Sequence, residues 1–270
     1  YEIIKVFNKS IIVEKPTFMK VSEIEKIYKL AKSKALNIFP VFQNRFNKAV
    51  RRVKEGIIRN ELGKIRMISV RVRWCRPQRY YDLAPWRGTF ALDGGCLTNQ
   101  GIHHIDLMRY FVGEVDKVNS KMMTLGSRIE VEDSAVASLI FKNKVLGNLE
   151  ITTAARPIDY EASISIIGDT GLAQIGGIAV NELQIYTPKP KICAKNSEDF
   201  SRDVYGKGHQ EIYKQIVDFY NNNSKFSVSR RDAFNTIQLL NSLYISDEKN
   251  KWIDVKSSRD SIRLGKKNEN

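Results

Sequence analysis

The sequence is poor in cysteine and histidine, which narrows the chemistry available to it. The cysteines are odd in number, widely spaced and outside any CxxC pair: Cys75, Cys96 and Cys193. We therefore expect reduced thiols, with neither a disulfide framework nor a zinc or other metal site. Histidine chemistry is confined to the few positions where this residue occurs: His103, His104 and His209.

Long apolar runs are also absent. No stretch approaches the roughly 20 residues that a membrane helix needs. The first residues lack the basic-then-apolar order of a signal peptide. We therefore expect a cytoplasmic protein that has no membrane partner.

Acidic residues are in the minority, with 30 Asp and Glu against 44 Lys and Arg and a net charge of +14. The densest basic stretch runs from Arg71 to Arg87 (RVRWCRPQRYYDLAPWR). No helix-turn-helix, zinc-finger or RNP-type signature accompanies it, so nucleic-acid binding is not favoured. An acidic small substrate is the simpler explanation of the charge.

Strand and helix patterns alternate over residues 1–62. Ile11–Val13 is predicted to be a short buried strand, and residues 22–35 (SEIEKIYKLAKSKA) have helical spacing with a Ser22/Glu25 capping box. A second apolar run at 37–42 and a second helical pattern at 49–58 follow. This order predicts a parallel α/β layer.

From Gly63 the spacing is that of half-buried strands, and residues 63–270 are predicted to form an α+β domain with a mostly antiparallel sheet. Lys142–Lys144 joins two alternating runs as a probable hairpin turn. One helix is expected from about Thr98 to Phe111. Helical patterns return within 208–246, where we leave open that they pack back on the first domain, and 257–270 is expected to be a frayed tail.

The stretch LDGGCLTNQGIHHIDLMRYF contains two of the histidines. On one continuous helix, Asn99, His103 and Asp106 share a face, whereas His104 points about a quarter-turn away. A neutral imidazole with a carboxylate behind it is the usual arrangement of a general base near neutral pH. The alternative is a satisfied polar pair on a half-buried helix, and both interpretations remain open.

Lys15 is the second candidate for catalysis. Pro16 favours an extended conformation at Lys15, which follows a predicted parallel strand, and open α/β sheets bind ligands at the carboxyl ends of such strands. The alternative is a solvated lysine whose neighbour Glu14 is its ion-pair partner. His209 opens a late helix as either a polar cap residue or a substrate contact.

IIVEKP near the start and DGGCLTNQGIHHID in the middle resemble, in that order, the glucose-fructose oxidoreductase, inositol dehydrogenase and rhizopine catabolism (Gfo/Idh/MocA) family of NAD(P)-dependent sugar dehydrogenases. FQNRFNKAVRRVKE, LGKI, WRGTFALDGG and GHQEIYKQIVDF extend the resemblance over nearly the whole chain. The form WRGT…DGG.L.NQGIHHIDL is similar to the branch that oxidises the 3-hydroxyl of UDP-linked N-acetylated aminosugar uronic acids in surface-polysaccharide synthesis. The resemblance implies that 1–62 is the C-terminal remainder of a Rossmann domain and that 63–270 binds substrate and builds a homodimer or homotetramer through its sheet.

The resemblance also implies roles for individual residues. Lys15 and His103 would carry catalysis, with hydride passing from a sugar carbon to NAD, or alternatively NADP, while one of the two takes the hydroxyl proton. The sequence does not decide which one does so. Asn99 stands where the family often has aspartate. The implied substrate contacts are Asn99, Asp106, Arg73, Tyr81, Arg87 and His209, and the implied cofactor contacts are Glu14, Lys15, Pro16, Gln43, Arg45 and Trp86.

One family feature is absent from the sequence, since no G-x-G-x-x-G follows a strand in it. A complete dinucleotide fold would place at least two βαβ units before EIIKVF. We favour a truncated product or partial gene of an ordinary dehydrogenase. The alternatives are an inactive sugar-binding or oligomerisation remnant, and an enzyme whose missing part is a separate chain or segment. As given, the chain is expected to bind NAD poorly.

Overall fold

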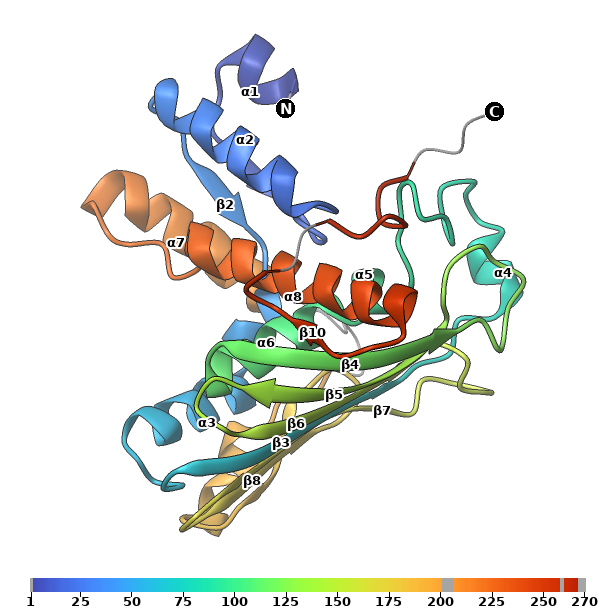
Figure 1. Ribbon diagram of the computed structural model, residues 1–270. Coiled ribbons are helices and arrows are strands. Elements are labelled where there is room, and N and C mark those ends of the chain that lie inside the picture. The colour runs from blue at the N-terminus through green and yellow to red at the C-terminus, as the bar shows by residue number, and fades with distance from the viewer. Residues whose placement is uncertain (1, 201–205, 258–259, 267–270) are drawn as a thin grey trace.

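The structure is a computed structural model and describes residues 2–200, 206–257 and 260–266 (Figure 1). It begins with a small parallel layer of α1 (Glu2–Phe7), β1 (Ile11–Val13), α2 (Val21–Ser33) and β2 (Ile38–Pro40). β1 and β2 pair in parallel, with Ile12 opposite Phe39. The parallel α/β order predicted for this region is confirmed.

Two details of the first layer differ from the prediction. The β1 strand is not buried, because Ile12 is 45% exposed and β2 is the only strand that pairs with β1 within the described residues. The Ser22/Glu25 capping box is also wrong. The N-cap of α2 is Lys20, which makes no side-chain capping bond, and Asp260 instead accepts hydrogen bonds from the Val21 amide (2.6 Å) and the Ser22 hydroxyl (2.5 Å).

The 3-10 turn η1 (Gln43–Phe46) and helix α3 (Lys48–Ile58) lead into an eight-stranded sheet. Its strand order is β10-β4-β5-β6-β3-β7-β8-β9. Only β3 and β6 pair in parallel, and the remaining neighbours are antiparallel, as predicted. The strands are β3 (Ile65–Arg73), β4 (Val115–Met123), β5 (Ser134–Phe141), β6 (Leu146–Thr152), β7 (Glu161–Gly168), β8 (Leu172–Gly176), β9 (Glu182–Tyr186) and β10 (Ile253–Asp254).

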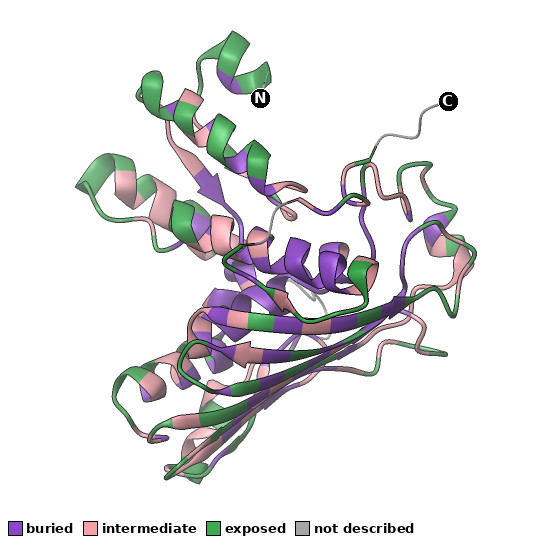
Figure 2. Cartoon of the chain, viewed as in Figure 1, coloured by how far each residue is buried: buried purple, intermediate pink, exposed green. Residues whose placement is uncertain are grey.

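The predicted hairpin is present, because residues 142–145 connect the antiparallel strands β5 and β6. Along β3, the side chains of Ile68, Val70 and Val72 are fully buried, and the intervening residues are partly or fully exposed. Strand periodicity therefore assigns each side chain to one of two faces. The buried face packs against helices α3, α6 (Ile102–Val112) and α8 (Arg230–Lys249), and the opposite face is open (Figures 1 and 2).

The helix expected from about Thr98 to Phe111 is in fact two helices, α5 (Cys96–Asn99) and α6, which are separated at Gln100–Gly101. The two glycines that precede α5 are closely packed. A Cβ on Gly95 would lie 1.9 Å from the Glu132 carboxylate, and Gly94 has φ +65° with Thr98 packed beside it. These two positions require glycine because neither offers room for a side chain. The remaining short helical segments are α4 (Gln78–Tyr81), η2 (Pro190–Ile192) and η3 (Ala194–Asn196).

The late helices lie beside both parts of the molecule. α7 (Gly208–Asn222) places aromatic rings against Phe39 of β2, and α8 packs on β4, on α6 and on α2. The residues after β10 were expected to fray, but Ser261 and Leu264 are buried (4% and 0% exposed). The rest of that predicted tail lies partly outside the described residues. None of the helices described has the length and apolar character needed to cross a membrane.

Candidate active site

Lys15 and Asn99 meet where the small parallel layer faces the large sheet domain. Lys15 follows β1, and its Nζ donates hydrogen bonds to Asn99 Oδ1 (2.5 Å) and to the Asn99 backbone carbonyl (3.1 Å). Asn99 is the last residue of α5. The lysine and the helix end therefore come from regions that are far apart in the sequence but in direct contact.

The environment of Lys15 favours loss of its proton. Burial lowers the pKa of the ammonium below its ordinary value. The Asp93 and Glu14 carboxylates oppose this and raise the pKa, whereas the guanidinium groups of Arg87 and Arg76 lower it. The Lys15 ammonium is thus shielded from solvent and donates hydrogen bonds to two oxygen atoms of Asn99. This arrangement suits a side chain that orients a substrate hydroxyl or exchanges a proton with it.

His103 occupies the first turn of α6 and is 7% exposed. Burial lowers the pKa of its imidazole well below the ordinary value, and the charge of Lys15 adds to this. The ring is therefore neutral near pH 7. Neither ring nitrogen has a hydrogen-bond partner within the described residues, and the nearest aromatic ring is that of Phe42, edge-on at 6.3 Å.

The carboxylate expected behind His103 lies elsewhere. Asp106 accepts hydrogen bonds from Arg45 Nε and Nη2 (both 2.6 Å) and from the Thr236 hydroxyl (3.0 Å). Arg45 and Asp106 are 6% and 0% exposed, so the pair is a buried link between η1 and α6. This arrangement gives no support to Asp106 as a substrate contact or to Arg45 as a cofactor contact, and both assignments stay predictions.

A cavity of about 240 Å³ opens at this junction. Its walls come from the turn after β1, from η1, from the segment 74–87, from α5 and α6, and from residues 159 and 178–179. Four buried polar atoms of the residues that line it have no hydrogen-bond partner in the part of the chain that the structure describes: His103 Nδ1 and Nε2, Gln43 Oε1 and Arg87 Nε. Because buried polar groups are nearly always hydrogen-bonded, a cavity with several such atoms is suited to a polar ligand.

Two arginines in the cavity wall are held by aromatic rings. Arg87 lies over Tyr80 (4.3 Å to the ring centre) and Trp86 (4.5 Å), and Arg76 lies over Trp74 (5.4 Å). Stacking fixes a guanidinium plane without neutralising its charge. Asp159 also lines the cavity and pairs with Arg76, so the net positive charge of the cavity comes from Arg87 and Lys15.

The structure brings five of the predicted site residues to this cavity: Lys15, Gln43, Arg87, Asn99 and His103. Glu14 and His209 lie just beside it, with 3.1 Å between Glu14 Oε1 and His209 Nε2. The N-cap of α7 is Lys207, so His209 is not the cap residue. Pro16 forms the turn behind Lys15. Trp86 is 41% exposed and supports Arg87 from outside the cavity.

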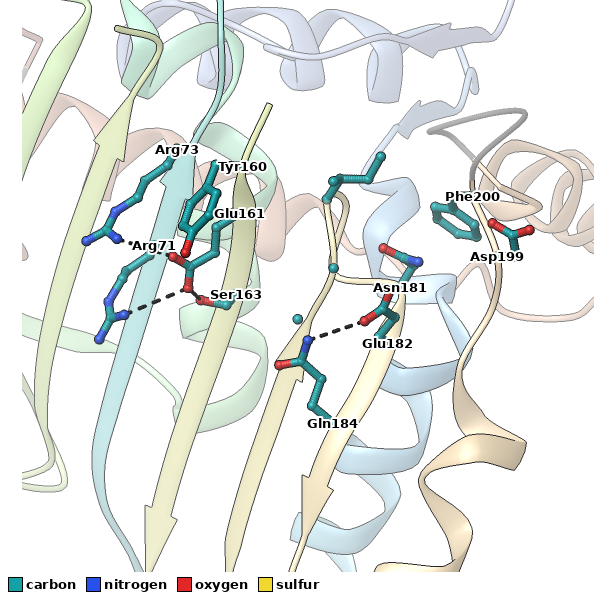
Figure 3. A pocket seen from close by; sticks show the side chains of 13 residues that line it. Arg71, Arg73, Tyr160, Glu161, Ser163, Asn181, Glu182, Gln184, Asp199 and Phe200 are labelled. Carbon is teal, nitrogen blue, oxygen red and sulfur yellow. Dashed lines mark hydrogen bonds and ion pairs between the residues drawn. The ribbon is translucent and has the colours of Figure 1, made fainter. Parts of the chain in front are cut away.

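Arg73 and Tyr81 are predicted substrate contacts that the structure places elsewhere. Arg73 lies on the open face of the large sheet, where its Nη1 is 3.5 Å from Glu161 (Figure 3). Its Nε is 2.6 Å from Glu150. Tyr81 is buried, with its hydroxyl 3.0 Å from the Thr153 hydroxyl. Neither side chain lines the cavity that holds Lys15 and His103.

Sequence reasoning missed several residues of the cavity. Arg76 and Tyr80 belong to the basic stretch from Arg71 to Arg87, so the charge pattern contained a signal for them. No motif pointed to Asp159, which binds Arg76 at 2.8 Å. Within the described part of the chain, no group of histidine, cysteine, aspartate or glutamate side chains is arranged to hold a metal ion.

Comparison with known proteins supports the family resemblance. Residues 50–174 match the GFO/IDH/MocA C-terminal domain. The WlbA dehydrogenase from Bordetella pertussis, solved with NADH and UDP-GlcNAcA, is 31% identical, with a TM-score of 0.84 over 91% of this chain and 72% of that one.

Curated relatives are more distant and longer. Myo-inositol 2-dehydrogenase of Thermotoga maritima is 25% identical over 61% of this chain and 48% of its own length. Levoglucosan dehydrogenase of Pseudarthrobacter phenanthrenivorans is 26% identical over 66% of this chain and 52% of its own length. The chain thus spans about half of these two relatives. Its fold, its site and these matches agree that the chain belongs to the GFO/IDH/MocA family.

Proposed function

We propose that this chain forms the substrate half of a nicotinamide-dependent sugar dehydrogenase, which oxidises a hydroxyl group of an acidic nucleotide sugar. The observation that carries the proposal is the cavity in which Lys15 and His103 converge with unpartnered buried nitrogen and oxygen atoms. Sugar hydroxyls both donate and accept hydrogen bonds, so they can satisfy such a mixed set. These atoms have no partner in the unliganded structure, so a ligand with hydroxyl groups can gain hydrogen bonds here that an apolar ligand cannot.

The side chains have complementary roles in this reaction. The neutral His103 ring can accept the proton of a sugar hydroxyl, and the Lys15 ammonium can donate a hydrogen bond that stabilises the developing alkoxide. If Lys15 is itself deprotonated, the roles exchange; burial acts in this direction, because it lowers the pKa of Lys15. Asn99 holds Lys15 in place through two oxygen atoms.

The fit of a dinucleotide cofactor to this chain is partial. Bound NAD, or alternatively NADP, would supply the hydride acceptor. Lys15, Pro16 and Gln43 follow strands β1 and β2 and are the residues that would hold its reactive end. The sequence contains no G-x-G-x-x-G to hold a pyrophosphate. We therefore expect the chain as given to bind NAD poorly, and saturable micromolar binding in calorimetry would contradict this.

Charge supports an acidic sugar as the substrate. Arg76, Arg87 and Lys15 surround the cavity, and planar guanidinium groups bind carboxylate and phosphate oxygens in pairs. The WlbA dehydrogenase was solved with UDP-GlcNAcA. We propose a UDP-linked N-acetylaminosugar uronate as the substrate, oxidised at its 3-hydroxyl in the synthesis of a surface polysaccharide.

Two nucleotide sugars that differ only in the carboxylate test the substrate. Calorimetry with UDP-GlcNAcA and with UDP-GlcNAc is expected to show at least ~10-fold tighter binding of the acid. Arg87→Ala should remove this preference. Arg66→Ala is the matched control, because Arg66 pairs with Asp169 on the surface. Equal affinities for both sugars, or no binding of either, would contradict the proposal.

A second assay separates an enzyme from an inactive sugar-binding remnant. NAD is added to the protein together with the acidic sugar, and the absorbance of reduced nicotinamide is followed. Its appearance supports a dehydrogenase. Saturable sugar binding without reduction, at NAD concentrations high enough to offset the expected weak binding, supports the remnant. The absent phosphate motif is the observation that favours the remnant.

We also propose that the open face of the large sheet joins two copies of the chain. Met67, Leu146 and Ile167 are neighbours across β3, β6 and β7 and are 39%, 54% and 45% exposed. On the same face, Arg71 and Arg73 of β3 pair with Glu161 of β7 (Figure 3), and Arg73 also pairs with Glu150 of β6. An apolar row flanked by charges of both signs suits a self-complementary interface. Sedimentation should show a dimer or tetramer that Leu146→Lys dissociates.

A further inference from the structure

Asp93 lies behind the proposed catalytic lysine without touching it. The side chain is 5% exposed, and it is not among the residues that line the cavity. One oxygen, Oδ2, accepts the Gly88 amide at 2.7 Å. The other oxygen, Oδ1, accepts the side-chain Nδ2 of Asn99. Asp93 therefore connects the loop that carries Arg87 to the end of α5.

The chemistry of the three groups fixes the orientation of the Asn99 amide. A carboxylate only accepts hydrogen bonds and an ammonium only donates them. Asn99 can satisfy both neighbours in one orientation, with Nδ2 toward Asp93 and Oδ1 toward Lys15 Nζ. Reversal of the amide would set a donor against the ammonium and an acceptor against the carboxylate.

We propose that Asp93 is a positioning residue, which acts through Asn99 to hold the Lys15 ammonium at the cavity and keeps one negative charge a single side chain away from it. This inference rests on the proposed function, in which Lys15 acts on the sugar hydroxyl. Asp93 reaches neither the cavity nor Lys15 and so is not itself a catalytic residue.

The charge of Asp93 competes with several others around Lys15. Glu14 lies on the same turn, Arg87 and Arg76 approach from the segment 74–87, and His103 approaches from α6. His209 of α7 contacts Glu14. Burial of Lys15 lowers its pKa, and Asp93 is the strongest of the groups that raise it. Loss of the Asp93 charge should therefore lower the pKa of Lys15 further.

Variants that remove or move the Asp93 carboxylate test its effect on the pKa of Lys15. Asp93→Asn removes the charge. Its amide cannot accept from both the Gly88 amide and Asn99 Nδ2, so one of these two hydrogen bonds is lost. The double variant Asp93→Asn/Asn99→Asp keeps the total charge and the number of hydrogen bonds, and it reverses the direction of the bond between positions 93 and 99. It places the carboxylate in direct contact with Lys15 Nζ. Asp169→Asn is the control, because Asp169 pairs with Arg66 on the surface.

The readout is the proton affinity of Lys15 itself. Competitive acetylation with acetic anhydride across a pH series, followed by peptide mass spectrometry, gives a midpoint for each lysine, and the exposed lysines of α2 serve as internal references. Relative to the unmodified protein, the midpoint of Lys15 should fall in Asp93→Asn and rise in the double variant. Each shift should be about one pH unit, a tenfold change in proton affinity. Asp169→Asn should leave the midpoint unchanged.

An unchanged or raised midpoint in Asp93→Asn overturns the proposal. If Asp93→Asn unfolds, the double variant decides alone, and a midpoint that does not rise overturns the proposal equally. The measurement needs neither sugar nor NAD. A Lys15 midpoint that shifts as expected in a protein that binds neither nucleotide sugar would refute the proposed function and leave the positioning role intact.

Discussion

The two sheets of this molecule differ in how completely each is enclosed. The eight-stranded sheet has one face sealed by helices, and the side chains of Ile68, Ile164 and Ile175 in it are fully buried. The two-stranded sheet has a satellite core centred on Ile4 and Ile27. Two-stranded sheets are marginal on their own, so the small layer depends on contacts with the rest of the molecule.

The small layer also exposes apolar side chains to solvent. They lie on α1 and β1: Ile3 (55% exposed), Val6 (64%), Phe7 (66%) and Ile12 (45%). The site nevertheless needs both regions, since Lys15 comes from the small layer and His103 from the large domain. The comparison suggests that catalysis is sensitive to the contact between the regions, whereas global stability resides mainly in the large sheet.

The largest effect should come from removing either side of the site. At NAD concentrations high enough to offset the weak binding expected of this chain, Lys15→Ala or His103→Ala should lower kcat by about 10²–10⁴-fold, as expected for loss of a proton-transferring group. Lys26→Ala, on the exposed face of α2, is the control and should keep normal rates. Thermal unfolding should change little in each variant. Near-normal nicotinamide reduction by either site variant would refute the catalytic assignment.

The next effect concerns the buried ion pair that joins the regions. Asp106→Ala leaves Arg45 with only the longer contact to Asp232 (3.1 Å), and loss of one partner of a buried pair costs about 3–5 kcal/mol. Asp169→Ala breaks an exposed pair and should cost about 0–1 kcal/mol. Urea denaturation compares the two. Equal losses would mean that the buried pair does not fasten η1 to α6.

Features of the fold and the site that depend on neighbouring residues could be predicted from the sequence, whereas features that depend on residues distant in the sequence could not. Strand alternation and the hairpin at Lys142–Lys144 are local signals, and both were correct. The face that Asp106 shares with His103 was also a local inference, but Arg45 and Thr236 decide the role of Asp106. These residues are 61 and 130 positions away along the chain, and no local pattern encodes such contacts.

Arg73 lies away from the cavity, and the sequence itself contained the information that places it there. Period-two alternation puts Arg73 on the face opposite Val72, whose buried side chain faces the helices. The cavity lies among the helices beyond the end of the same strand, where Trp74 and Arg76 contribute to it. Counting faces along β3 would have replaced Arg73 with Arg76. In contrast, α2 is capped from a distance by Asp260, which no sequence window around Ser22 contains.

The unequal burial of the two sheets gives a third prediction. Ile68→Ala empties a fully buried position of β3 and should cost about 2–5 kcal/mol. The same change at Ile12, which is 45% exposed on β1, should cost less than about 1 kcal/mol. Chemical denaturation gives both values. A large loss of unfolding free energy in Ile12→Ala would show that β1 is covered in solution by more than its pairing with β2.

The last prediction concerns a carboxyl group buried behind α5. Glu132 accepts hydrogen bonds from the Tyr244 hydroxyl (2.6 Å) and the Leu97 amide (3.2 Å), while its other oxygen has no partner among the described residues. Burial raises the pKa of Glu132 from 4.5 to about 7. Between these values the unfolded chain releases this proton and the folded protein keeps it. The contribution of Glu132 to stability is therefore complete below about pH 4.5 and is lost as the pH rises through about 7.

Glu132→Gln tests this dependence, because glutamine keeps the shape of the side chain and cannot ionise. Unfolding free energies measured at about pH 5 and about pH 8 should fall with rising pH in the unmodified protein, with Glu132 accounting for up to about 3 kcal/mol. The decline should be smaller in the variant by a similar amount. Parallel curves for the two proteins would mean that Glu132 is already ionised in the fold. The large domain would then tolerate a buried charge against α5, beside the residues that contact Lys15.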